Sequence, residues 1–506
     1  MAKGKVSLVG AGPGDPGLLT ARAIELIGQA DVIFYDRLIP PNALTGARDD
    51  AELIYVGKMP GTVHNPQEEI NRQIVEAAKA GRTVVRLKGG DPFIFGRGGE
   101  EAEELAEAGI AFEVVPGVTA AIAATATAGI PLTHRDDSAG VAFVTGHRDA
   151  RAREQGIDPD GSLARFPGTL VFYMGVKRLA ENMADLIAGG RPADQPAAAI
   201  QNGATPKQRV VTATLGTIAE AVERESIRPP ALIVIGDVVR HHAKLAWFGS
   251  RPLAGRRVVV TRAKHQAGKL SATLRGRGAE VIEMPVIEIE PLSPDGEALD
   301  VFARGDLDLI CFTSPNAVDR FFDVLHEELE LDSRALAPYL IASIGRSTAR
   351  RLKEHGIKAD IVPDQAVAES LLGKLIEEGH GDKRILIPRA LEAREVLPEG
   401  LRQAGAEVTV LPLYRTVPVA PDEALLKEAA AADAITFTSA STVRNLLAAV
   451  PGGLSGPANI SIGPITSEAM REAGVEITAE ATQSDLEGLA DAVDRALREQ
   501  ETGGPR

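Results

Sequence analysis

The chain has 506 residues, of which 44% are hydrophobic and 25% are charged, and its formal net charge is −15. At about 150 residues per domain this length predicts two or three folded units, and the composition excludes disordered, collagen-like and coiled-coil proteins. Because a negative field repels polyanions, we expect no nucleic-acid partner. The charge still allows an acidic small substrate if arginines gather in one cleft.

The single cysteine and the apolar tracts bear on the compartment. Cys311 allows no disulfide within the chain, which favours a reducing environment, and its place on an apolar run predicts a core position. Residues 1–5 run directly into the apolar stretch 6–9, without the long apolar core of a secretory signal. The longest apolar tract, residues 118–130, is shorter than the roughly 20 residues of a membrane helix. We therefore expect a cytoplasmic protein with no membrane partner.

Short β-branched runs alternate with helix-favouring stretches along the chain, which predicts α/β units built on parallel sheets. The strands expected in the first half are residues 6–9, 32–35, 83–87, 170–174 and 232–235, with a helix over 18–27. Residues 241–255 show no period and contain the turn residues Gly249, Ser250 and Pro252, so the main boundary is expected near residue 250. A second set of strands begins at residues 257–261.

Three landmarks of the second half occur twice, in the same order, at an offset of about 120 residues. The first copies are Arg256–Arg262, Phe312–Ser314 and Ser343–Gly345, and the second copies are Lys383–Arg389, Phe437–Ser439 and Ser461–Gly463. Each landmark is expected to end a strand and open a helix, which predicts two similar α/β lobes. A cleft between them would offer hydroxyls and helix-start amides to an anionic ligand, although most such Ser and Thr residues simply cap helices.

The glycine-rich turn Gly10–Gly17 follows an expected strand but does not fit a nucleotide-phosphate loop. The dinucleotide pattern needs glycine where Asp15 stands, and a P-loop needs Gly-Lys-Ser/Thr. Pro13 lacks an amide donor, and the Asp15 carboxylate would repel phosphate. The turn therefore favours a phosphate-poor ligand, with a plain tight turn as the alternative.

Residues 86–101 combine a dense run of glycines with Arg86, Lys88, Asp91 and Arg97, directly after an expected strand. A bare turn does not need so many charges, so we expect close approach of backbone to a ligand. The nine histidines contain no His-Glu-x-x-His pattern, and the pair His241-His242 has no cysteine companions, so we expect no metal site.

Residues 4 to about 248 resemble uroporphyrinogen-III C-methyltransferase, the S-adenosylmethionine-dependent enzyme that makes precorrin-2. The matching motifs, in chain order, are Gly10–Asp15, Tyr35–Leu38, Val56–Lys58, Arg86–Glu101, Gly129–Arg135, Thr145–His147, Tyr173–Gly175 and Gln208–Val211. The resemblance implies a two-lobed tetrapyrrole methylase fold, usually homodimeric, with adenosylmethionine bound between the lobes.

The resemblance also assigns residues by motif. Asp36 matches the family's proton acceptor and Lys58 its proton donor; without the family, Asp36 reads as a turn or N-cap residue. An electron-rich pyrrole carbon attacks the sulfonium methyl in line, so positioning matters most and a carboxylate can deprotonate the cationic intermediate. Arg37, Arg135 and His147 are expected partners of substrate carboxylates. The implied adenosylmethionine contacts are Pro13, Gly89, Gly90, Asp91, Ile94, Thr119, Ala120, Met174 and Gly203, the last where this chain departs from the family's usual Asn-Gly-Thr.

Residues 256 to about 498 resemble uroporphyrinogen-III synthase, which closes hydroxymethylbilane to uroporphyrinogen III while inverting the last pyrrole ring. The matching motifs are Phe312–Val318, Ser343–Gly345, Pro412–Thr416, Phe437–Ser439 and Ser461–Pro464. The resemblance implies two lobes, no cofactor, and a catalytic Tyr414 that assists loss of the hydroxyl leaving group. The residues implied to line the substrate cleft are Arg262, Thr313, Ser314, Asn316, Thr348, Arg389, Thr438, Ser439 and Thr466.

These expectations combine into an α/β fold class with two catalytic halves. We expect a two-lobed tetrapyrrole methylase fold over residues 1–248, a linker at 249–255, a two-lobed α/β uroporphyrinogen-III synthase fold over 256–498, and a disordered tail at 499–506. The predicted protein makes uroporphyrinogen III and methylates it at C2 and C7 with S-adenosylmethionine, acts on small-molecule tetrapyrroles, and dimerises through the methyltransferase half. Two alternatives stay open: a non-catalytic tetrapyrrole-binding second half, and a first half that methylates a later corrinoid.

Overall fold

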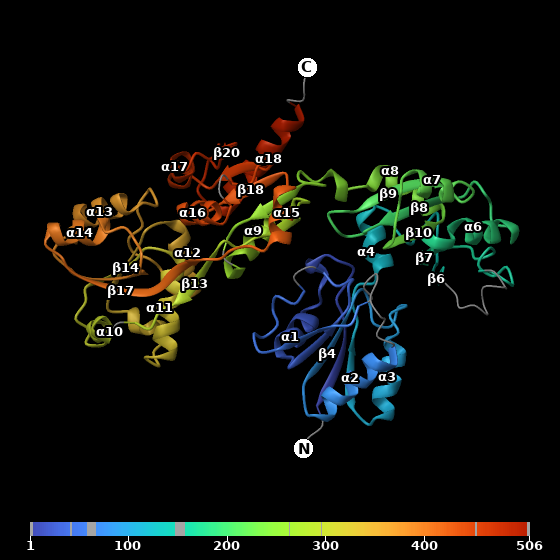
Figure 1. Cartoon of the computed structure of the whole chain (residues 1–506), viewed down its shortest axis with the longest axis horizontal. Helices are drawn as coiled ribbons and strands as arrows, with labels where there is room; N and C mark the ends of the chain where they lie inside the picture. The colour runs from blue at the N-terminus through green and yellow to red at the C-terminus, as the bar shows by residue number, and fades with distance from the viewer. Residues whose placement is uncertain are drawn as a thin grey trace. The chain divides into compact units, whose positions relative to one another are not determined.

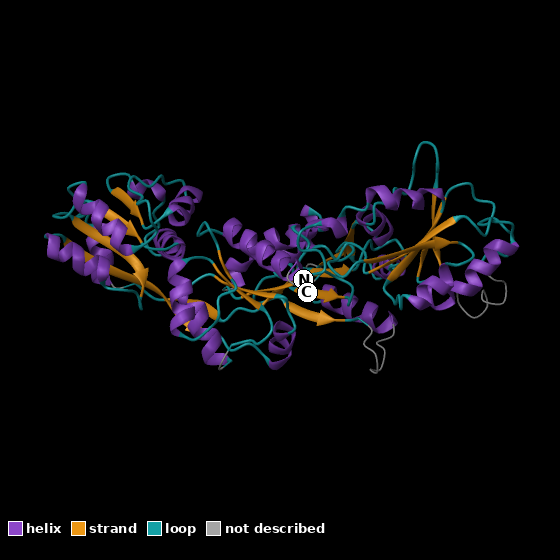
Figure 2. Ribbon diagram, turned by 90° about the horizontal axis from the view of Figure 1, so that it is seen from above, coloured by secondary structure: helices purple, strands orange, loops and turns teal. Residues whose placement is uncertain are grey.

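The computed structural model describes residues 4–40, 43–57, 67–146, 157–262, 264–294, 296–450 and 453–502. The chain divides into two compact units, unit 1 (Met1–Arg256 with Arg275–Glu280) and unit 2 (Arg257–Leu274 with Val281–Arg506). Figure 2 shows strands gathered into sheets with helices packed along them, so the α/β class predicted from the sequence is confirmed. Within the described residues, no helix is both long and apolar enough to cross a membrane.

The first sheet of unit 1 is parallel throughout, in the order β3-β2-β4-β1-β5. Alternate side chains of β1 enter different cores, since Val6 and Leu8 pack on one face and Val9 on the other. Helix α1 begins at Ala21, later than predicted, because the Thr20 hydroxyl accepts a hydrogen bond from the Ala23 amide and caps it. The elements are β1 (Lys5–Gly10), η1 (Pro16–Leu18), α1 (Ala21–Gln29), β2 (Val32–Tyr35), β3 (Glu52–Tyr55), α2 (Gln67–Lys79), β4 (Val84–Lys88), α3 (Gly98–Glu107) and β5 (Ala111–Val115) (Figure 1).

The second sheet of unit 1 is mixed, in the order β6-β7-β10-β8-β9, with only β6 and β7 parallel. The short helix α4 packs on it through alanines such as Ala121 and Ala124, whose small side chains contact Val171 and Ala198. The elements are α4 (Ala120–Thr127), β6 (Val141–Thr145), β7 (Thr169–Tyr173), η2 (Val176–Arg178), α6 (Leu179–Ala188), β8 (Pro196–Gln201), β9 (Arg209–Thr214), α7 (Ile218–Arg224), β10 (Ala231–Ile235), η3 (Asp237–His241), α8 (His242–Leu245) and η4 (Phe248–Ser250).

Unit 2 contains two further five-stranded sheets. The discontinuous lobe, named for its two separate chain segments, has the order β12-β11-β18-β19-β20, and the continuous lobe has the order β13-β17-β16-β14-β15. The discontinuous lobe holds β11 (Arg257–Val260), α9 (Lys264–Gly276), β12 (Glu280–Glu283), α15 (Glu423–Ala430), β18 (Ala434–Phe437), α16 (Ala440–Ala449), β19 (Ala458–Ser461), α17 (Pro464–Glu472), β20 (Ala479–Glu480) and α18 (Leu486–Thr502). The continuous lobe holds β13 (Ile287–Pro291), α10 (Gly296–Ala303), β14 (Leu309–Phe312), α11 (Pro315–Glu327), η5 (Ser333–Leu336), β15 (Leu340–Ser343), α12 (Arg346–Glu354), α13 (Ala368–Glu377), β16 (Arg384–Ala390), α14 (Val396–Ala404) and the long β17 (Glu407–Pro418).

The repeated landmarks occupy matching places in the two sheets, but the copies are exchanged between the lobes. Strand β11, from the first copy, pairs in parallel with β18, which comes from the second copy. Strand β16, from the second copy, pairs in parallel with β14, which comes from the first copy. Each lobe therefore carries one set of all three landmarks, assembled from different copies.

The carboxyl-terminal residues differ from the expected disordered tail. Helix α18 continues to Thr502, so residues 499–502 are helical, and residues 503–506 lie outside the described part of the chain. The helix is anchored by the buried side chains Leu489, Val493 and Leu497, which share one face. Its final residues are helix formers that extend this anchored segment.

Candidate active sites

Three glycine-containing loops meet at the carboxyl ends of β1, β4 and β5 in unit 1. The Gly12 and Gly90 backbones exchange hydrogen bonds of 3.2 and 2.7 Å, which join the first loop to the second. The Asp91 carboxylate accepts the amides of Phe93 and Gly117, at 2.8 and 3.1 Å, and so joins the second loop to the third. The carboxyl edge of a parallel sheet is where α/β proteins commonly bind ligands.

The glycines at this edge leave no room for side chains. A Cβ at Gly10 would lie 2.5 Å from the Gly117 amide nitrogen, and one at Gly117 would lie 2.2 Å from the Gly90 carbonyl oxygen. Gly90 also has φ of +72°, which favours glycine. Close contact between the loops therefore accounts for part of the glycine content, besides any approach to a ligand.

Helix α4 begins beside the same loops, and a tyrosine organises its first turn. The Tyr173 hydroxyl accepts the Ala121 amide at 2.9 Å and lies 2.6 Å from the Thr119 hydroxyl. The Phe95 ring packs against Tyr173 at 4.9 Å between centroids. Burial raises the pKa of Tyr173, which keeps the phenol neutral. Thr119 and Ala120 thus lie at a fixed helix start, next to the loop that carries Ile94.

The remaining expected cofactor residues come from the second lobe of unit 1 and from the first loop. Met174 has φ of +54° and the residue is 54% exposed, so it is available for contact. At Gly203 a Cβ would lie 2.2 Å from Ala124, which ties this loop to α4. A Cβ at Gly14, next to Pro13, would lie 2.7 Å from Thr205, so the first loop reaches the same region.

A buried charge network supports Asp36 at the end of β2. Arg86 donates to the Asp36 carboxylate at 2.8 Å and to Glu101 at 3.2 Å, and Lys88 donates to Glu101 at 2.8 Å. The Glu101 side chain is 1% exposed, whereas that of Asp36 is 29% exposed. Burial lowers the pKa of Lys88, with a smaller contribution from the neighbouring Arg86 charge. The network presents one partly open carboxylate, that of Asp36, beside a closed cluster in which the buried Glu101 Oε2 has no hydrogen-bond partner among the described residues.

The expected substrate partners of unit 1 are only partly described. Arg37 and Arg135 are both exposed, so their guanidinium groups are accessible to the carboxylates of a ligand. Lys58 and His147 lie outside the described residues, so the structure places neither of them.

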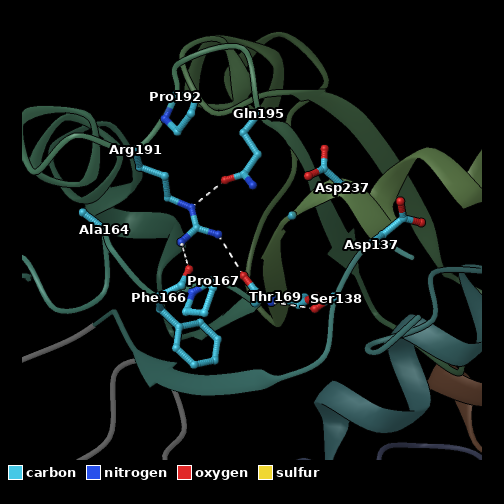
Figure 3. Close-up of a pocket in the computed structure, with 12 residues that line it drawn as sticks. Asp137, Ser138, Ala164, Phe166, Pro167, Thr169, Arg191, Pro192, Gln195 and Asp237 are labelled. Atoms are coloured by element: carbon cyan, nitrogen blue, oxygen red, sulfur yellow. Dashed lines mark hydrogen bonds between the residues drawn. The ribbon is translucent and has the colours of Figure 1, made fainter. Parts of the chain in front are cut away.

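A pocket in the second lobe of unit 1 does not contain any of the expected cofactor residues. Figure 3 shows Arg191 in its wall, with the guanidinium bonded to Gln195 and to the backbone oxygens of Phe166 and Gly168. Arg191 is the side chain of this pocket that could bind an anion. Its guanidinium already donates hydrogen bonds to these acceptors and so stabilises the pocket wall. The pocket is therefore a weak candidate for a substrate site.

In unit 2 the repeated hydroxyl residues cap helices in both lobes. Ser314 accepts the Ala317 amide at 3.0 Å, and Ser439 accepts the Thr442 amide at 3.3 Å. Their backbones agree within a few degrees, with φ of −165° and −166°. The N-cap interpretation is thus correct for both serines. Thr313, Asn316 and Thr438 are half-buried beside these caps.

Tyr414 distinguishes the continuous lobe from the other. It lies on β17, is 5% exposed, and places its hydroxyl 2.9 Å from the Ser314 hydroxyl. Burial raises its pKa, although hydrogen bonds with Ser314 and Asn316 act in the opposite direction. The result is a neutral phenol at a helix start, suited to donating a proton.

Three of the expected cleft residues are almost fully buried in the structure, as Tyr414 is. Thr348 and Thr466 are 0% and 3% exposed because they occupy the third position of α12 and α17 and face the core. Arg389 is 5% exposed, and its guanidinium bonds to Glu395 at 2.6 Å and to the Ala393 carbonyl at 3.0 Å. In this arrangement Arg389 fixes the loop after β16. Arg262 is half-buried, and burial lowers its pKa.

Comparison with known proteins identifies both units. The family model of tetrapyrrole (corrin/porphyrin) methylases matches residues 5–219, and that of uroporphyrinogen-III synthase HemD matches residues 268–491. The porphyrin biosynthesis protein HemD of Ruminiclostridium josui is 40% identical over 478 residues, covering 93% of this chain and 94% of that protein. The chain belongs to this family of fused tetrapyrrole methylases and uroporphyrinogen-III synthases.

Further relatives match the tetrapyrrole methylase half. A uroporphyrinogen-III C-methyltransferase of Bacillus subtilis is 53% identical over 247 residues, which are 49% of this chain and 95% of that protein. A solved uroporphyrin-III C-methyltransferase of Thermus thermophilus, in complex with S-adenosyl homocysteine, is 43% identical and covers 47% of this chain and 94% of its own, with a TM-score of 0.40. The family-model match and the sequence relatives confirm the resemblance inferred from the motifs.

Within the tetrapyrrole methylase half, motif reasoning missed several residues that build the site. Glu101 and Tyr173 fall inside the motifs without an assigned part: Tyr173 meets Ala121 from 52 positions away, whereas Glu101 pairs with Lys88 of its own motif, 13 positions away. Gly10 and Gly117 likewise had no assigned part, and the available signal was a glycine at the end of β1 and one two residues after β5. In the synthase half, the contact of Ser314 with Tyr414 spans 100 residues and has no local signature.

Proposed function

We propose that the chain is a bifunctional enzyme of tetrapyrrole biosynthesis. Residues 256–498 cyclise hydroxymethylbilane to uroporphyrinogen III with inversion of ring D, and residues 1–248 methylate that product at C2 and C7 to give precorrin-2. The observation that carries the proposal is the match to a HemD relative across 94% of its length, with both halves in one chain. The geometry supports it, since each unit gathers polar groups at strand ends.

The residues of unit 1 fit S-adenosylmethionine. A cradle formed by Gly10, Gly90 and Gly117 packs three loop backbones together at the sheet edge and leaves no room for side chains between them. In the first loop Pro13 lacks an amide donor and the Asp15 carboxylate would repel phosphate, and adenosylmethionine has no phosphate. Adenosylmethionine, when bound, supplies an electrophilic methyl group on a sulfonium. Thr119, Ala120, Met174 and Gly203 are the further residues that would hold it.

Unit 1 contributes position and a base. The glycine loops and the start of α4 fix the cofactor side of the site, which orients the attacking pyrrole carbon for in-line transfer. Asp36 takes the proton that the pyrrole loses after methylation, and Arg86 holds the carboxylate in place at 2.8 Å. Arg37 and Arg135 bind substrate carboxylates from the exposed side.

Unit 2 contributes a proton donor. The Tyr414 phenol, whose pKa is raised further by burial, protonates the departing hydroxyl of the bilane, and Ser314 orients it at 2.9 Å. Thr313, Asn316, Thr438 and Ser439 line the strand ends that face the substrate. Arg262 adds positive charge near them.

One assay tests both activities. Purified chain is supplied with hydroxymethylbilane, first without and then with adenosylmethionine, and the products are separated by isomer and mass. We expect uroporphyrinogen III in the first reaction and a dimethylated product in the second. Only the spontaneous type I isomer in the first reaction would favour a non-catalytic tetrapyrrole-binding second half. Absence of methyl transfer to supplied uroporphyrinogen III would favour a later corrinoid as substrate of the first half.

We also propose that the protein acts in the cytoplasm as a homodimer joined through the methyltransferase half. The buried, unpaired thiol of Cys311 is compatible with a reducing compartment. Light scattering coupled to gel filtration tests the dimer. The expected mass is about twice that of the 53.2 kDa chain, and a monomer at micromolar concentration would contradict it.

A further inference from the structure

Three potential metal ligands meet in the second lobe of unit 1, away from the residues assigned to adenosylmethionine. They are His134 and Asp137, on the loop between α4 and β6, and His241, the last residue of η3. His241 follows Asp137 by 104 positions, so no local motif announces the group. One ligand atom from each residue lies within 4.8 Å of the others.

The Asp137 carboxylate is the centre of the cluster. Its Oδ2 atom lies 2.7 Å from His241 Nε2 and 3.2 Å from His134 Nδ1. The two imidazole rings are 4.3 Å apart between centroids and tilted by 37°, and the two distances show that each ring turns a nitrogen to this oxygen. All three side chains are partly exposed, which gives an ion and water access.

No lysine or arginine among the described residues competes with the two histidines for the Asp137 carboxylate. Among the described residues, the ion pairs of Asp137 are with His134 and His241 and not with a lysine or an arginine. Arg240, the neighbour of His241, pairs instead with Asp237 at 3.2 Å. His134 Nδ1 also accepts a long hydrogen bond of 3.3 Å from the Asp136 amide. A metal bound at Nδ1 would replace this hydrogen bond.

We propose that His134, Asp137 and His241 bind a divalent first-row transition-metal ion such as Zn²⁺. Imidazole nitrogen suits zinc, nickel, copper and iron, whereas magnesium and calcium prefer all-oxygen sites. Zinc ligands about 2.0 Å from the ion and at tetrahedral angles lie about 3.3 Å apart. The 3.2 Å separation matches this value, the 2.7 Å separation is shorter than it by about 0.6 Å, and the two imidazole nitrogens lie within 4.8 Å of each other.

The ion would tie two separate segments of unit 1 together. The loop of His134 also carries Arg135, and η3 follows the central strand β10 of the second sheet, so the metal fixes this loop to the sheet. Three protein ligands leave a coordination position for water or for a carboxylate of a bound ligand. The expected consequence is a more ordered loop and a raised melting temperature in the presence of metal.

Metal binding is measured directly on the full chain, with any affinity tag removed and metal stripped by a chelator. Zn²⁺ is titrated against a chromophoric chelator, and Co²⁺ is added to read the visible absorption of the bound ion. We expect one equivalent at this site and a Kd that rises at least about tenfold in His134→Ala, Asp137→Asn and His241→Ala. Neither bilane nor adenosylmethionine is added, so the result is independent of the proposed reactions.

Matched controls separate this cluster from nearby groups. Asp136→Asn removes a carboxylate of the same loop, and His326→Ala removes an exposed histidine of unit 2, so both should leave the Kd unchanged. His241→Gln keeps a polar side chain of similar length and distinguishes loss of a ligand from a disturbed η3. Absence of saturable binding, or binding that persists in both histidine variants, would overturn the proposal.

Discussion

The two units place polar groups at strand ends in opposite ways. Unit 1 buries a cluster of full charges, with Glu101 1% exposed between Arg86 and Lys88, and packs glycine backbones against one another. Unit 2 uses neutral hydroxyls, and the same helix cap appears in both of its lobes. A buried charge that loses its partner is costly, whereas a lost cap costs little. We therefore expect the first site to be the more sensitive to substitution.

The largest effect is expected from Glu101→Gln. The change removes the one carboxylate that pairs with both buried Arg86 and buried Lys88, and breaking such a pair costs about 3–5 kcal/mol. Urea unfolding followed by fluorescence of Trp247, the single tryptophan and a residue of unit 1, reports the loss. Glu103→Gln, at an exposed position of α3, is the control. Equal stability of the two variants would show that the charge network does not support this site.

Gly117→Ala tests the glycine packing. The new Cβ would lie 2.2 Å from the Gly90 carbonyl oxygen, a backbone atom that cannot move aside cheaply. We expect unit 1 to lose about 1–3 kcal/mol of unfolding free energy and methyl transfer to fall while cyclisation continues. Gly46→Ala, whose Cβ would meet no atom within 4 Å, is the matched control for stability. Normal methyl transfer in Gly117→Ala would contradict the cradle assigned to adenosylmethionine.

Tyr414→Phe tests whether cyclisation by unit 2 depends on one proton donor, the Tyr414 hydroxyl. We expect cyclisation to fall at least about tenfold, with methylation of supplied uroporphyrinogen III unchanged. Burial raises the pKa of the phenol, so the protonated donor is present below that raised pKa and is lost only as the pH rises through it. The native rate should therefore not decline between pH 7 and 9 on account of this group. Tyr339→Phe, in the same lobe, is the control, and an equal effect of both variants would remove Tyr414 from the mechanism.

The sequence predicts local structure well because the strands are buried apolar runs with sharp ends. Strands β2 and β4 lie within one residue of the predicted positions, and the repeated Phe-Thr-Ser and Ser-Ile-Gly landmarks do end strands and precede helices. Cys311 is also buried as predicted, and burial raises its pKa to about 12. Each of these properties depends on residues that are neighbours in the chain.

Long-range pairing is what the sequence does not reveal. The repeat predicts two lobes, but not that β11 pairs with β18, because register between distant strands has no local signal. The direction of a side chain on a helix start is similarly hidden. Thr348 and Thr466 follow their motifs closely and yet face the core. The contact between His134 and His241 arises in the same way, from loops that only the fold brings together.

The smallest effect, and the most direct test of the duplication, comes from Ser314→Ala and Ser439→Ala. Both substitutions remove an N-cap with the same backbone conformation. Each should therefore lower the unfolding free energy of unit 2 by about 1 kcal/mol, as measured by urea unfolding followed by circular dichroism. Their effects on cyclisation should differ, because Ser314 alone of the two also contacts the Tyr414 hydroxyl, whereas Ser439 contacts Ser441. We expect Ser314→Ala to slow cyclisation several-fold and Ser439→Ala to leave it near the native rate. If both variants slowed cyclisation equally, the two caps would affect the reaction only through the stability of the lobes. Ser314 would then not orient the Tyr414 hydroxyl for proton transfer.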